Sequence, residues 1–521
     1  MVNKRTASAQ VSLKEPAPKE PAPAPQPMAK AFMVQGTGSD AGKSLLVAGL
    51  CRAFTRRGLV VRPFKPQNMS NNAAVTSDSG EIGRAQALQA RACGVAPHTD
   101  MNPVLLKPEH DSGAQLVVNG HMRGQVKPQD FRTFKETLLP DVLAAFERLK
   151  STCDLVIVEG AGSPSEVNLR AGDIANMGFA LAANAPDGVP VVLAGDVEKG
   201  GVIAQVVGTH AVLMPSERAL IKGFVINKFR GDVALFMPAM TDIEARTGWP
   251  GLGVVGWFLD AAKLPKEDSA SLGTWLEAGR GHGAHPIRIA VPRLARIANF
   301  DDLDPLMAED DVEVLMIEAG QAIPGDVDVI VLPGSKSVIS DLRQVKTERW
   351  DIDIAAHLHR GGLVVGLCGG YQMLGQRISD PDGIEGDAGE EPGLGFLDVE
   401  TVLTGDKTLE QVTGKVAATG LDIAGYEMHI GLTEGPDRHT PWFHLQDGRE
   451  EGALSPSGHV MGTYLHGVFA TDAFRHDFLS QLREGRSGGA AYEQGVENAL
   501  DALADHLEAC LDLDTVLGLA T

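Results

Sequence analysis

Short apolar runs that each end in a glycine-rich turn are the feature that most constrains the fold of this chain. A first series stands at 31–36, 60–66, 155–160, 190–196 and 221–228, and segments with helical periodicity, such as 44–58, separate the runs. The runs lack the polar alternation of a half-exposed strand, so they predict strands that are buried on both faces, as in parallel sheets. Strands that alternate with helices in this way predict an α/β fold.

A second series of the same kind stands at 286–291, 312–318, 327–334 and 361–370. The stretch 263–285 before it is rich in small, charged and glycine residues, which is typical of a linker. We therefore expect two doubly wound domains with mostly parallel sheets, at 30–262 and 286–485. Residues 1–29 are rich in Pro and Ala and predict a disordered tail, and Leu500, Leu503 and Leu507 have the spacing of a helix within 486–521.

The charge of the chain argues against whole classes of partner. It has 46 Lys and Arg against 68 Asp and Glu, a formal net charge of −22, which disfavours binding to nucleic acid or to an anionic membrane. No window holds the roughly 18 consecutive apolar residues of a membrane span. The five cysteines lie far apart in the sequence, which favours neither a zinc site nor a disulfide framework and predicts a reducing, cytoplasmic location.

The turn after the first run has the residues of a phosphate-binding loop. The segment GTGSDAGKS at 36–44 follows a predicted strand and opens a predicted helix. In such a loop small residues let backbone N–H groups face the phosphates, a Lys reaches the β and γ oxygens, and a hydroxyl binds Mg²⁺. The alternative is a helix capped by Ser39 or Asp40 with no ligand. The candidate ATP-binding residues are Thr37, which stands where the strict motif has Gly, with Gly38, Asp40, Gly42, Lys43 and Ser44.

Two further polar residues end predicted strands. Glu159 is a candidate Mg²⁺ ligand together with Ser44, and its alternative role is to cap the following turn. Either Asp78 or Glu81 is expected to complete the metal shell, and the sequence does not choose between them. Asn227 is suited to hydrogen-bond an adenine edge, although a lone Asn in a turn is common.

The first domain resembles known families at several segments. GTGSDAGKS, VEGAG at 158–162 and INK at 226–228 are similar to the dethiobiotin synthetase type of P-loop domain, which phosphorylates a carboxylate and tolerates Thr at the position of Thr37. The segments 64–90 and 194–205 resemble the amino-terminal domain of the cobyric acid synthase family. Asp196 resembles that family's acidic position near the reacting carboxylate, with capping of a turn as its alternative role.

The segment after the second run carries candidate substrate-binding groups. Lys65 is placed to neutralise a substrate carboxylate or the charge of a developing phosphate. The amides of Gln67, Asn68, Asn71 and Asn72 offer donors to acid or amide groups of a large ligand. For any single Asn, a polar loop without a ligand is an equally good interpretation.

The second domain contains a predicted nucleophile elbow. A strand, Cys368 between small residues, and a helix follow one another at 361–375, which holds a thiol at a helix N-terminus where its thiolate is favoured. His466 follows another predicted strand and is the candidate base. The pair resembles the class I, triad-type glutamine amidotransferase family, in which the Cys attacks the glutamine carboxamide. The segment VIVLPGSKSV at 329–338 matches the family's oxyanion strand, so the resemblance implies backbone N–H donors at Gly334 and Gly369.

One departure leaves the third catalytic role open. Many members have Glu two residues after the His, where this chain has Val468, and dyad-like variants occur among the cobyric acid and cobyrinic acid diamide synthases. Glu427 and His429 are expected to shape the glutamine site or the interface, with core packing as an equal alternative.

The resemblance covers about 31–482 and implies an ATP-driven amidotransferase. Its expected reaction is amidation of the b, d, e and g carboxylates of adenosylcobyrinic acid a,c-diamide, through an acyl phosphate and with ammonia from glutamine. ATP and Mg²⁺ are expected, and no tightly bound prosthetic group. The alternatives are a related amidotransferase, such as the a,c-diamide synthase or a cell-wall precursor amidase, and a partition-type ATPase. The order of amidation, the ammonia path and the oligomeric state stay open.

Overall fold

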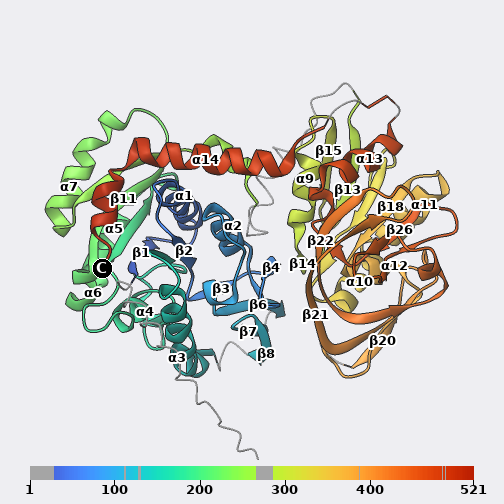
Figure 1. The fold of residues 1–521 in the computed structure, drawn as a ribbon, viewed down its shortest axis with the longest axis horizontal. Helices are drawn as coiled ribbons and strands as arrows, with labels where there is room; N and C mark the ends of the chain where they lie inside the picture. The colour runs from blue at the N-terminus through green and yellow to red at the C-terminus, as the bar shows by residue number, and fades with distance from the viewer. Residues whose placement is uncertain are drawn as a thin grey trace, which may run out of the picture.

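The structure is a computed structural model that describes residues 29–110, 113–126, 131–265, 285–385, 388–483, 485–486 and 489–521. Most of the tail and of the linker expected from the sequence lies outside these residues. Figure 1 shows two α/β bodies joined along one side by a long helix, α14. Among the described residues no helix is long and apolar enough to cross a membrane.

The first domain is built on a six-stranded parallel sheet in the order β12-β11-β10-β1-β9-β2. Its central strand β1 is buried except at its first residue, which explains the lack of polar alternation in the sequence. The α/β architecture predicted for this part of the chain is confirmed. The elements of this sheet and its helices are β1 (Lys30–Gly36), α1 (Lys43–Arg56), β2 (Val61–Phe64), α2 (Arg84–Ala92), α3 (Phe131–Lys150), β9 (Leu155–Glu159), α4 (Met177–Ala182), β10 (Val191–Asp196), α5 (Val202–Val212), α6 (Pro215–Leu220), β11 (Ile221–Phe229), α7 (Met237–Thr247) and β12 (Gly251–Gly256).

Two small sheets are inserted between β2 and α3, and the sequence pattern did not predict them. They lie on the side of the first domain that faces the second domain (Figure 1). Three of these strands have only three residues and the other three mix polar with apolar residues, so they lack the long apolar runs of the main sheet and were missed. The strands are β3 (Gln67–Met69), β4 (Ala73–Val75), β5 (Glu81–Gly83), β6 (Val104–His110), β7 (Gly113–Val118) and β8 (His121–Val126).

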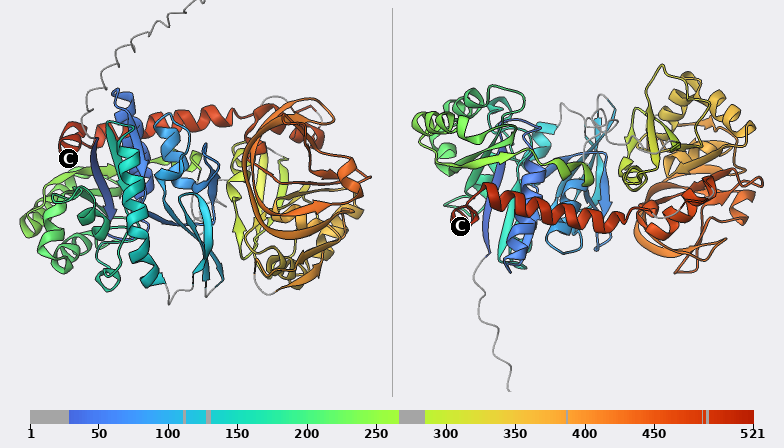
Figure 2. Two further views of the ribbon diagram at one scale, coloured as in Figure 1. Left: turned by 60° about the horizontal axis from the view of Figure 1, so that its bottom comes forward. Right: turned by 90° about the horizontal axis from the view of Figure 1, so that it is seen from above.

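The second domain has a sheet in the order β15-β13-β16-β18-β26-β25, parallel except for the β25–β26 pair. A mostly antiparallel seven-stranded sheet lies over it, and its long strands are the orange arcs in Figure 2. The parallel sheet confirms the prediction, whereas the antiparallel layer was not predicted. The elements are β13 (Ile287–Pro292), β14 (Ile297–Ala298), α9 (Asp304–Met307), β15 (Val312–Ile317), β16 (Val329–Leu332), β17 (Gly334–Ser335), α10 (Val338–Thr347), α11 (Trp350–His359), β18 (Leu363–Leu367), α12 (Gly369–Leu374), β19 (Arg377–Asp380), β20 (Gly389–Pro392), β21 (Glu400–Val416), β22 (Asp422–Glu434), β23 (Phe443–Leu445), β24 (Glu450–Glu451), β25 (Ala453–Leu454), β26 (Val460–Thr463), β27 (Leu465–His466) and α13 (Asp472–Leu482).

The C-terminal segment returns to the first domain instead of ending on the second. It forms two helices, α14 (Tyr492–Cys510) and α15 (Leu513–Gly518), and α14 crosses from one domain to the other (Figures 1 and 2). Its buried leucines pack into the same core cluster as α1 and β1. Nε of Arg52 on α1 donates to Asp501 of α14 at 2.8 Å, and the terminal Thr521 pairs through its backbone with Ala31 of β1. The sequence predicted a helix here but not its partner.

Candidate active sites in the two domains

Cys368 occupies the turn between β18 and α12. Its backbone has φ 50° and ψ −107°, a strained conformation for a residue with a side chain. The following turn of helix is pressed against the neighbouring strand, because a Cβ at Gly370 would lie 2.0 Å from the carbonyl oxygen of Leu332. The glycines of this segment therefore allow the strand-to-helix turn that presents the thiol at the carboxyl end of β18.

His466 is held by a carboxylate that the sequence did not identify. Nδ1 of His466 lies 2.7 Å from Oδ2 of Asp302, and the other oxygen of Asp302 accepts a bond from the backbone N–H of Gly467 at 2.6 Å. The ring of Tyr426 stacks on the imidazole, with ring centroids 5.3 Å apart. Burial opposes the charge on His466, but the carboxylate of Asp302 and the thiolate of Cys368 raise its pKa to about 10.

Asp302 thus stands where the third member of a catalytic triad would stand. Val468, at the position where many relatives have Glu, is buried in the hydrophobic core instead. Asp302 comes from the 3-10 turn Phe300–Leu303, which lies 164 residues before His466 in the sequence. The adjacent acids Asp301 and Asp302 can be seen in the sequence, but no known spacing relates them to His466.

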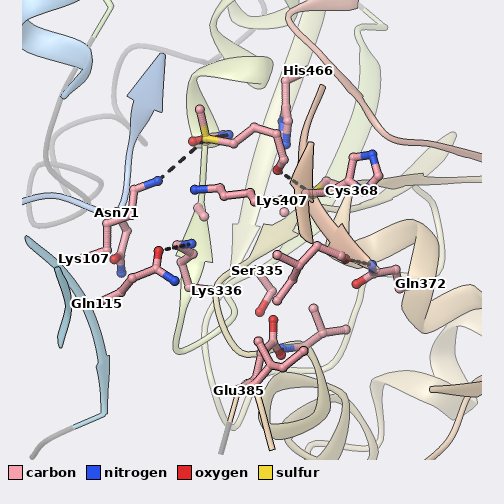
Figure 3. A pocket seen from close by; sticks show the side chains of 18 residues that line it. Asn71, Lys107, Gln115, Ser335, Lys336, Cys368, Gln372, Glu385, Lys407 and His466 are labelled. Carbon is pink, nitrogen blue, oxygen red and sulfur yellow. Dashed lines mark hydrogen bonds between the residues drawn. The ribbon is translucent and has the colours of Figure 1, made fainter. Parts of the chain in front are cut away.

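The pocket around Cys368 and His466 is lined by both domains (Figure 3). The first domain supplies Asn71, Lys107 and Gln115, and the second supplies Gly334, Lys336, Lys407 and His429 among others. The backbone of Gly334 lies beside the imidazole, since a Cβ there would be 3.2 Å from Cε1 of His466. Gly369 follows the nucleophile as the first residue of α12. Of the two expected oxyanion donors, Gly334 lines the pocket, whereas Gly369 only adjoins it as the residue after Cys368.

Asn71, expected at the site of the large substrate, belongs to this thiol pocket instead. Its side-chain oxygen is buried and has no hydrogen-bond partner within the described residues. His429, from β22, also lines the pocket and stacks on Tyr464 with ring centroids 3.7 Å apart. Glu427 on the same strand forms an ion pair with Arg449 at 2.6 Å.

Glu81 does not lie in the nucleotide site. Its buried carboxylate forms ion pairs with Lys107 of the first domain and Lys407 of the second. Burial would raise the pKa of Glu81, but the two lysines hold it well below the usual range. Asp78 instead accepts hydrogen bonds from Thr99, at 2.6 Å from the hydroxyl and 3.2 Å from the backbone N–H. The structure therefore corrects the expectation that one of these acids joins Ser44 and Glu159, because both are bonded elsewhere.

The P-loop lysine is held by backbone carbonyls. Nζ of Lys43 donates to the carbonyl oxygens of Gly38, Ser39 and Gly162 at 3.0, 3.2 and 3.1 Å. Burial lowers the pKa of Lys43 to about 8, although Glu159 opposes this shift. A neutralising phosphate group would remove the cost of keeping this buried ammonium charged.

The loop around Lys43 is closed by Asn227 at the end of β11. Gly42 has φ 81°, and a Cβ there would lie 2.4 Å from Nδ2 of Asn227. That amide donates to the carbonyl oxygen of Ala41 at 2.9 Å. Asn227 therefore supports the loop backbone, which is a role beyond the expected contact with a base.

Glu159 accepts hydrogen bonds from several side chains in a second pocket, which lies beside the P-loop and which we call the synthase pocket. Its Oε1 accepts from the hydroxyl of Ser44 and from Nζ of Lys65, both at 2.8 Å, and its Oε2 accepts from Nε2 of Gln89 at 2.6 Å. Burial would raise the pKa of Glu159, but Lys65 and these hydrogen bonds lower it. A cavity of about 590 Å³ opens here, and the expected residues that line it are Lys43, Ser44, Lys65, Gln67, Asn68 and Glu159.

Thr37 and Asp40, expected at the nucleotide site, and Asp196, expected near the reacting carboxylate, do not line this cavity. The hydroxyl of Thr37 donates to Gln205 at 2.8 Å, and Asp40 forms an exposed ion pair with Lys199 at 2.6 Å. Asp196 pairs in register with Asn227 across β10 and β11 and accepts from Nζ of Lys228 at 3.2 Å. In this structure none of the three donates to or accepts from Lys43.

One segment connects the two pockets. Gln67, Asn68 and Met69 line the synthase pocket, and Asn71, only two residues later, lines the pocket of Cys368. Two residues of extended chain span about 7 Å. The two pockets are therefore neighbours on either side of this short segment.

A third cavity adjoins the P-loop and was not predicted. It measures about 170 Å³ and is lined by Gly42 and Asn227, by the aromatic rings of Trp257 and Phe258, and by His506 of α14 with its neighbouring leucines. Nε2 of His506 lies 2.9 Å from the carbonyl oxygen of Gly256. Its flat apolar walls beside a phosphate loop fit a purine ring. The sequence offered no signal, because α14 lies far from the P-loop along the chain.

The described residues contain no group of three or more His, Cys, Asp or Glu side chains that could hold a metal ion. The hydroxyl of Ser44 and the carboxylate of Glu159 nevertheless are the hard oxygen donors that Mg²⁺ uses when phosphate oxygens complete its shell.

Models of two known protein families match successive parts of the chain. Residues 32–272 match the CobQ/CobB/MinD/ParA nucleotide binding domain, and residues 288–474 match the CobB/CobQ-like glutamine amidotransferase domain. The chain is 58% identical to a protein named cobyric acid synthase from Hyphomonas neptunium, over 94% of this chain and 98% of that one. Proteins of the same name from Rhodobacter capsulatus and Bradyrhizobium diazoefficiens are 59% and 57% identical, over 94% and 95% of this chain and 99% and 100% of theirs.

Proposed function

The chain belongs to the cobyric acid synthase family of glutamine-dependent amidating ligases, and we propose that its two neighbouring pockets divide that reaction between them. The thiol pocket releases ammonia from glutamine, and the synthase pocket activates a carboxylate of adenosylcobyrinic acid a,c-diamide with ATP. The observation that carries this proposal is the Cys368–His466–Asp302 arrangement in a pocket that the first domain helps to line.

In the thiol pocket the chemistry begins with the thiolate of Cys368. It adds to the carboxamide carbon of glutamine, and the C–N bond breaks as His466 gives its proton to the leaving nitrogen, which departs as ammonia. Water then attacks the thioester while His466 takes a proton from it, and glutamate leaves. Asp302 holds the imidazole by Nδ1, so that Nε2 serves as the proton donor and acceptor. The backbone N–H groups at Gly334 and Gly369 are the proposed donors to the tetrahedral oxyanion.

In the synthase pocket a carboxylate oxygen of the corrinoid attacks the γ-phosphorus of ATP, and ADP leaves. The product is an acyl phosphate, which ammonia attacks at the acyl carbon to form the amide and release phosphate. Lys43 is positioned to neutralise the transferred phosphoryl group, and Lys65 to neutralise the incoming carboxylate. Gln67 and Asn68 are the proposed contacts for side chains of the macrocycle.

Ser44 and Glu159 are the residues that would hold Mg²⁺ with the phosphates of ATP. The ion, when bound, offsets negative charge on the phosphate oxygens. Asp78 and Glu81 are left out of this proposal because their carboxylates are bonded elsewhere. The ion pair of Lys65 with Glu159 would have to open for the lysine to meet the substrate.

We propose that ammonia crosses beside the segment 67–71. The support is the position of Asn71 in one pocket and of Gln67 to Met69 in the other. A short, enclosed path keeps ammonia unprotonated and away from bulk water. The purine ring of ATP is assigned to the cavity between Asn227, Trp257 and His506.

Incubation with ATP, Mg²⁺, glutamine and adenosylcobyrinic acid a,c-diamide tests the reaction. Mass spectrometry should show successive exchange of acid for amide at the b, d, e and g positions. Amidation of cobyrinic acid at a and c instead would assign the reaction of the sister enzyme, and ATP hydrolysis without any amide would contradict the proposal.

A second experiment tests the activities of the two pockets separately. Cys368→Ala should abolish turnover with glutamine while turnover with ammonium salts survives, because the acyl phosphate still forms. Cys510→Ala, at the end of α14 and outside this pocket, is the matched control and should keep both activities. Loss of both activities in a folded Cys368→Ala protein would argue against two separate sites.

A further inference from the structure

Arg84 belongs to the first domain, yet its side chain forms an ion pair and a hydrogen bond with residues of the second domain. It is the first residue of α2, and its guanidinium lies 2.5 Å from Oδ2 of Asp301 and donates to the hydroxyl of Tyr426 at 2.5 Å. The centre of the guanidinium also lies 5.5 Å from the centroid of the Tyr426 ring. The side chains of Arg84 and Asp301 are 15% and 10% exposed, so solvent screens this pair only weakly.

Both partners of Arg84 flank the catalytic imidazole. Asp301 directly precedes Asp302, which holds Nδ1 of His466. Tyr426 stacks on the ring of His466, with an interplanar angle of 22°. Arg84 therefore fixes Tyr426, which stacks on the imidazole, and Asp301, the chain neighbour of the acid that holds it. Arg84 itself is not among the residues that line the thiol pocket.

Other residues of α2 form hydrogen bonds with Glu159 of the synthase pocket. Nε2 of Gln86 and Nε2 of Gln89 donate to Oε2 of Glu159 at 3.4 and 2.6 Å. Glu159 also accepts from Ser44, the residue after the P-loop lysine. The nine residues of α2 thus connect the carboxylate of the nucleotide site to the neighbours of His466.

We propose that Arg84 is a positioning residue for glutamine hydrolysis, and that α2 transmits the occupancy of the nucleotide site to His466 through it. This inference rests on the proposed function of the two pockets. A Mg²⁺ ion held with ATP by Ser44 and Glu159 would compete with the amide donors of Gln86 and Gln89 for the oxygens of Glu159. The position of α2 would then depend on whether the synthase pocket is filled. A short helix moves as a unit, and its first residue carries the change to Asp301 and Tyr426.

The test compares glutamine hydrolysis with and without ATP, Mg²⁺ and the a,c-diamide in the full-length protein. Wild type should hydrolyse glutamine faster when the synthase pocket is filled. Arg84→Ala should lower kcat for glutamine by about tenfold or more and remove this stimulation, with little change in KM, because substrate contacts remain. Amidation supported by ammonium salts should stay within about twofold of wild type, since the phosphoryl-transfer residues are untouched.

Three further variants distinguish a positioning role of Arg84 from a general loss of folding or stability. Arg84→Lys keeps the charge and should restore part of kcat. Tyr426→Phe removes only the accepting hydroxyl and should give an intermediate loss, which covers the case in which Arg84→Ala fails to fold. Arg91→Ala is the matched control, because Arg91 is on the same helix but pairs with Glu493 and Glu497 of α14. It should behave as wild type.

Two results would overturn the inference. One is an Arg84→Ala or Tyr426→Phe protein with wild-type kcat and wild-type stimulation. The other is an equal loss in Arg91→Ala. Absence of glutamine hydrolysis or of amidation in wild type would instead count against the proposed function, so the two failures are distinguishable.

Discussion

Asp302 and His466 form a buried hydrogen bond of 2.7 Å between Oδ2 and Nδ1. The bond joins a 3-10 turn near the start of the second domain to a short strand near its end. It holds the ring in one orientation and favours the protonated imidazole, and the charge of the nearby Cys368 favours the same state. A domain that has Val468 where Glu is common can therefore still operate a triad, with the acid supplied from a different part of the chain.

Removing the charge of Asp302 should slow glutamine hydrolysis. Asp302→Asn leaves the shape of the site but offers Nδ1 a poorer acceptor, and we expect kcat to fall by about a hundredfold or more. The pKa of His466, held at about 10 partly by Asp302, should fall. The alkaline limb of the pH profile of kcat/KM should then move to lower pH, because the imidazolium loses its proton earlier. Asp310→Asn, at an exposed position, is the control, and an unchanged profile in Asp302→Asn would contradict the assignment.

Nucleotide affinity should fall as the pH rises through the pKa of Lys43. Burial lowers this pKa to about 8 in the free protein, and phosphate groups favour the charged form when they bind. Binding should therefore be pH-independent below about pH 7 and weaken by about tenfold per pH unit above about pH 8. Titration calorimetry with a non-hydrolysable ATP analogue measures this dependence. Lys43→Arg, which stays charged, should bind with no such slope, and the same slope in that variant would assign the effect to another group.

The buried carboxylate of Glu81 should be important for stability. Glu81→Gln leaves Lys107 and Lys407 without their partner across the domain interface, and an uncompensated buried charge costs about 3–5 kcal/mol. Denaturant unfolding should show this loss. Asp422→Asn removes the partner of an exposed pair with Lys415 and should cost about 0–1 kcal/mol. Equal costs for the two variants would show that Glu81 does not depend on its lysines.

The cavity beside α14 should determine affinity for the base of ATP. His506→Ala removes one wall of this cavity, and we expect KM for ATP to rise by about tenfold with little change in kcat, because the phosphates keep their contacts. Initial rates of ammonia-supported amidation measure both constants. Gln494→Ala, at an exposed position of the same helix, should change neither. A fall in kcat alone would place the effect outside base binding.

Local sequence was sufficient for the features whose parts are contiguous. The apolar runs predicted the parallel strands, because strands buried on both faces must be apolar throughout. The strand, Cys368 and helix predicted an elbow, and the P-loop residues predicted a phosphate site, because a turn between a strand and a helix is built from neighbouring residues.

The features of the two sites that sequence reasoning missed depend on distant segments. The triad acid Asp302, the pairing of Glu81 with two lysines, and the return of α14 to the P-loop join residues far apart along the chain. The role of Asn71 changed for the same reason, since only the approach of the second domain brings it to Cys368.

The sequence by itself therefore determined the fold class and the two chemistries, since apolar periodicity and short motifs are read within one strand, turn and helix. The tertiary structure decided which acid serves His466, which acids stay out of the nucleotide site, and which helix connects the two pockets. The physical reason is that a carboxylate acts through the group it lies beside, and that neighbour is set by the packing of whole domains.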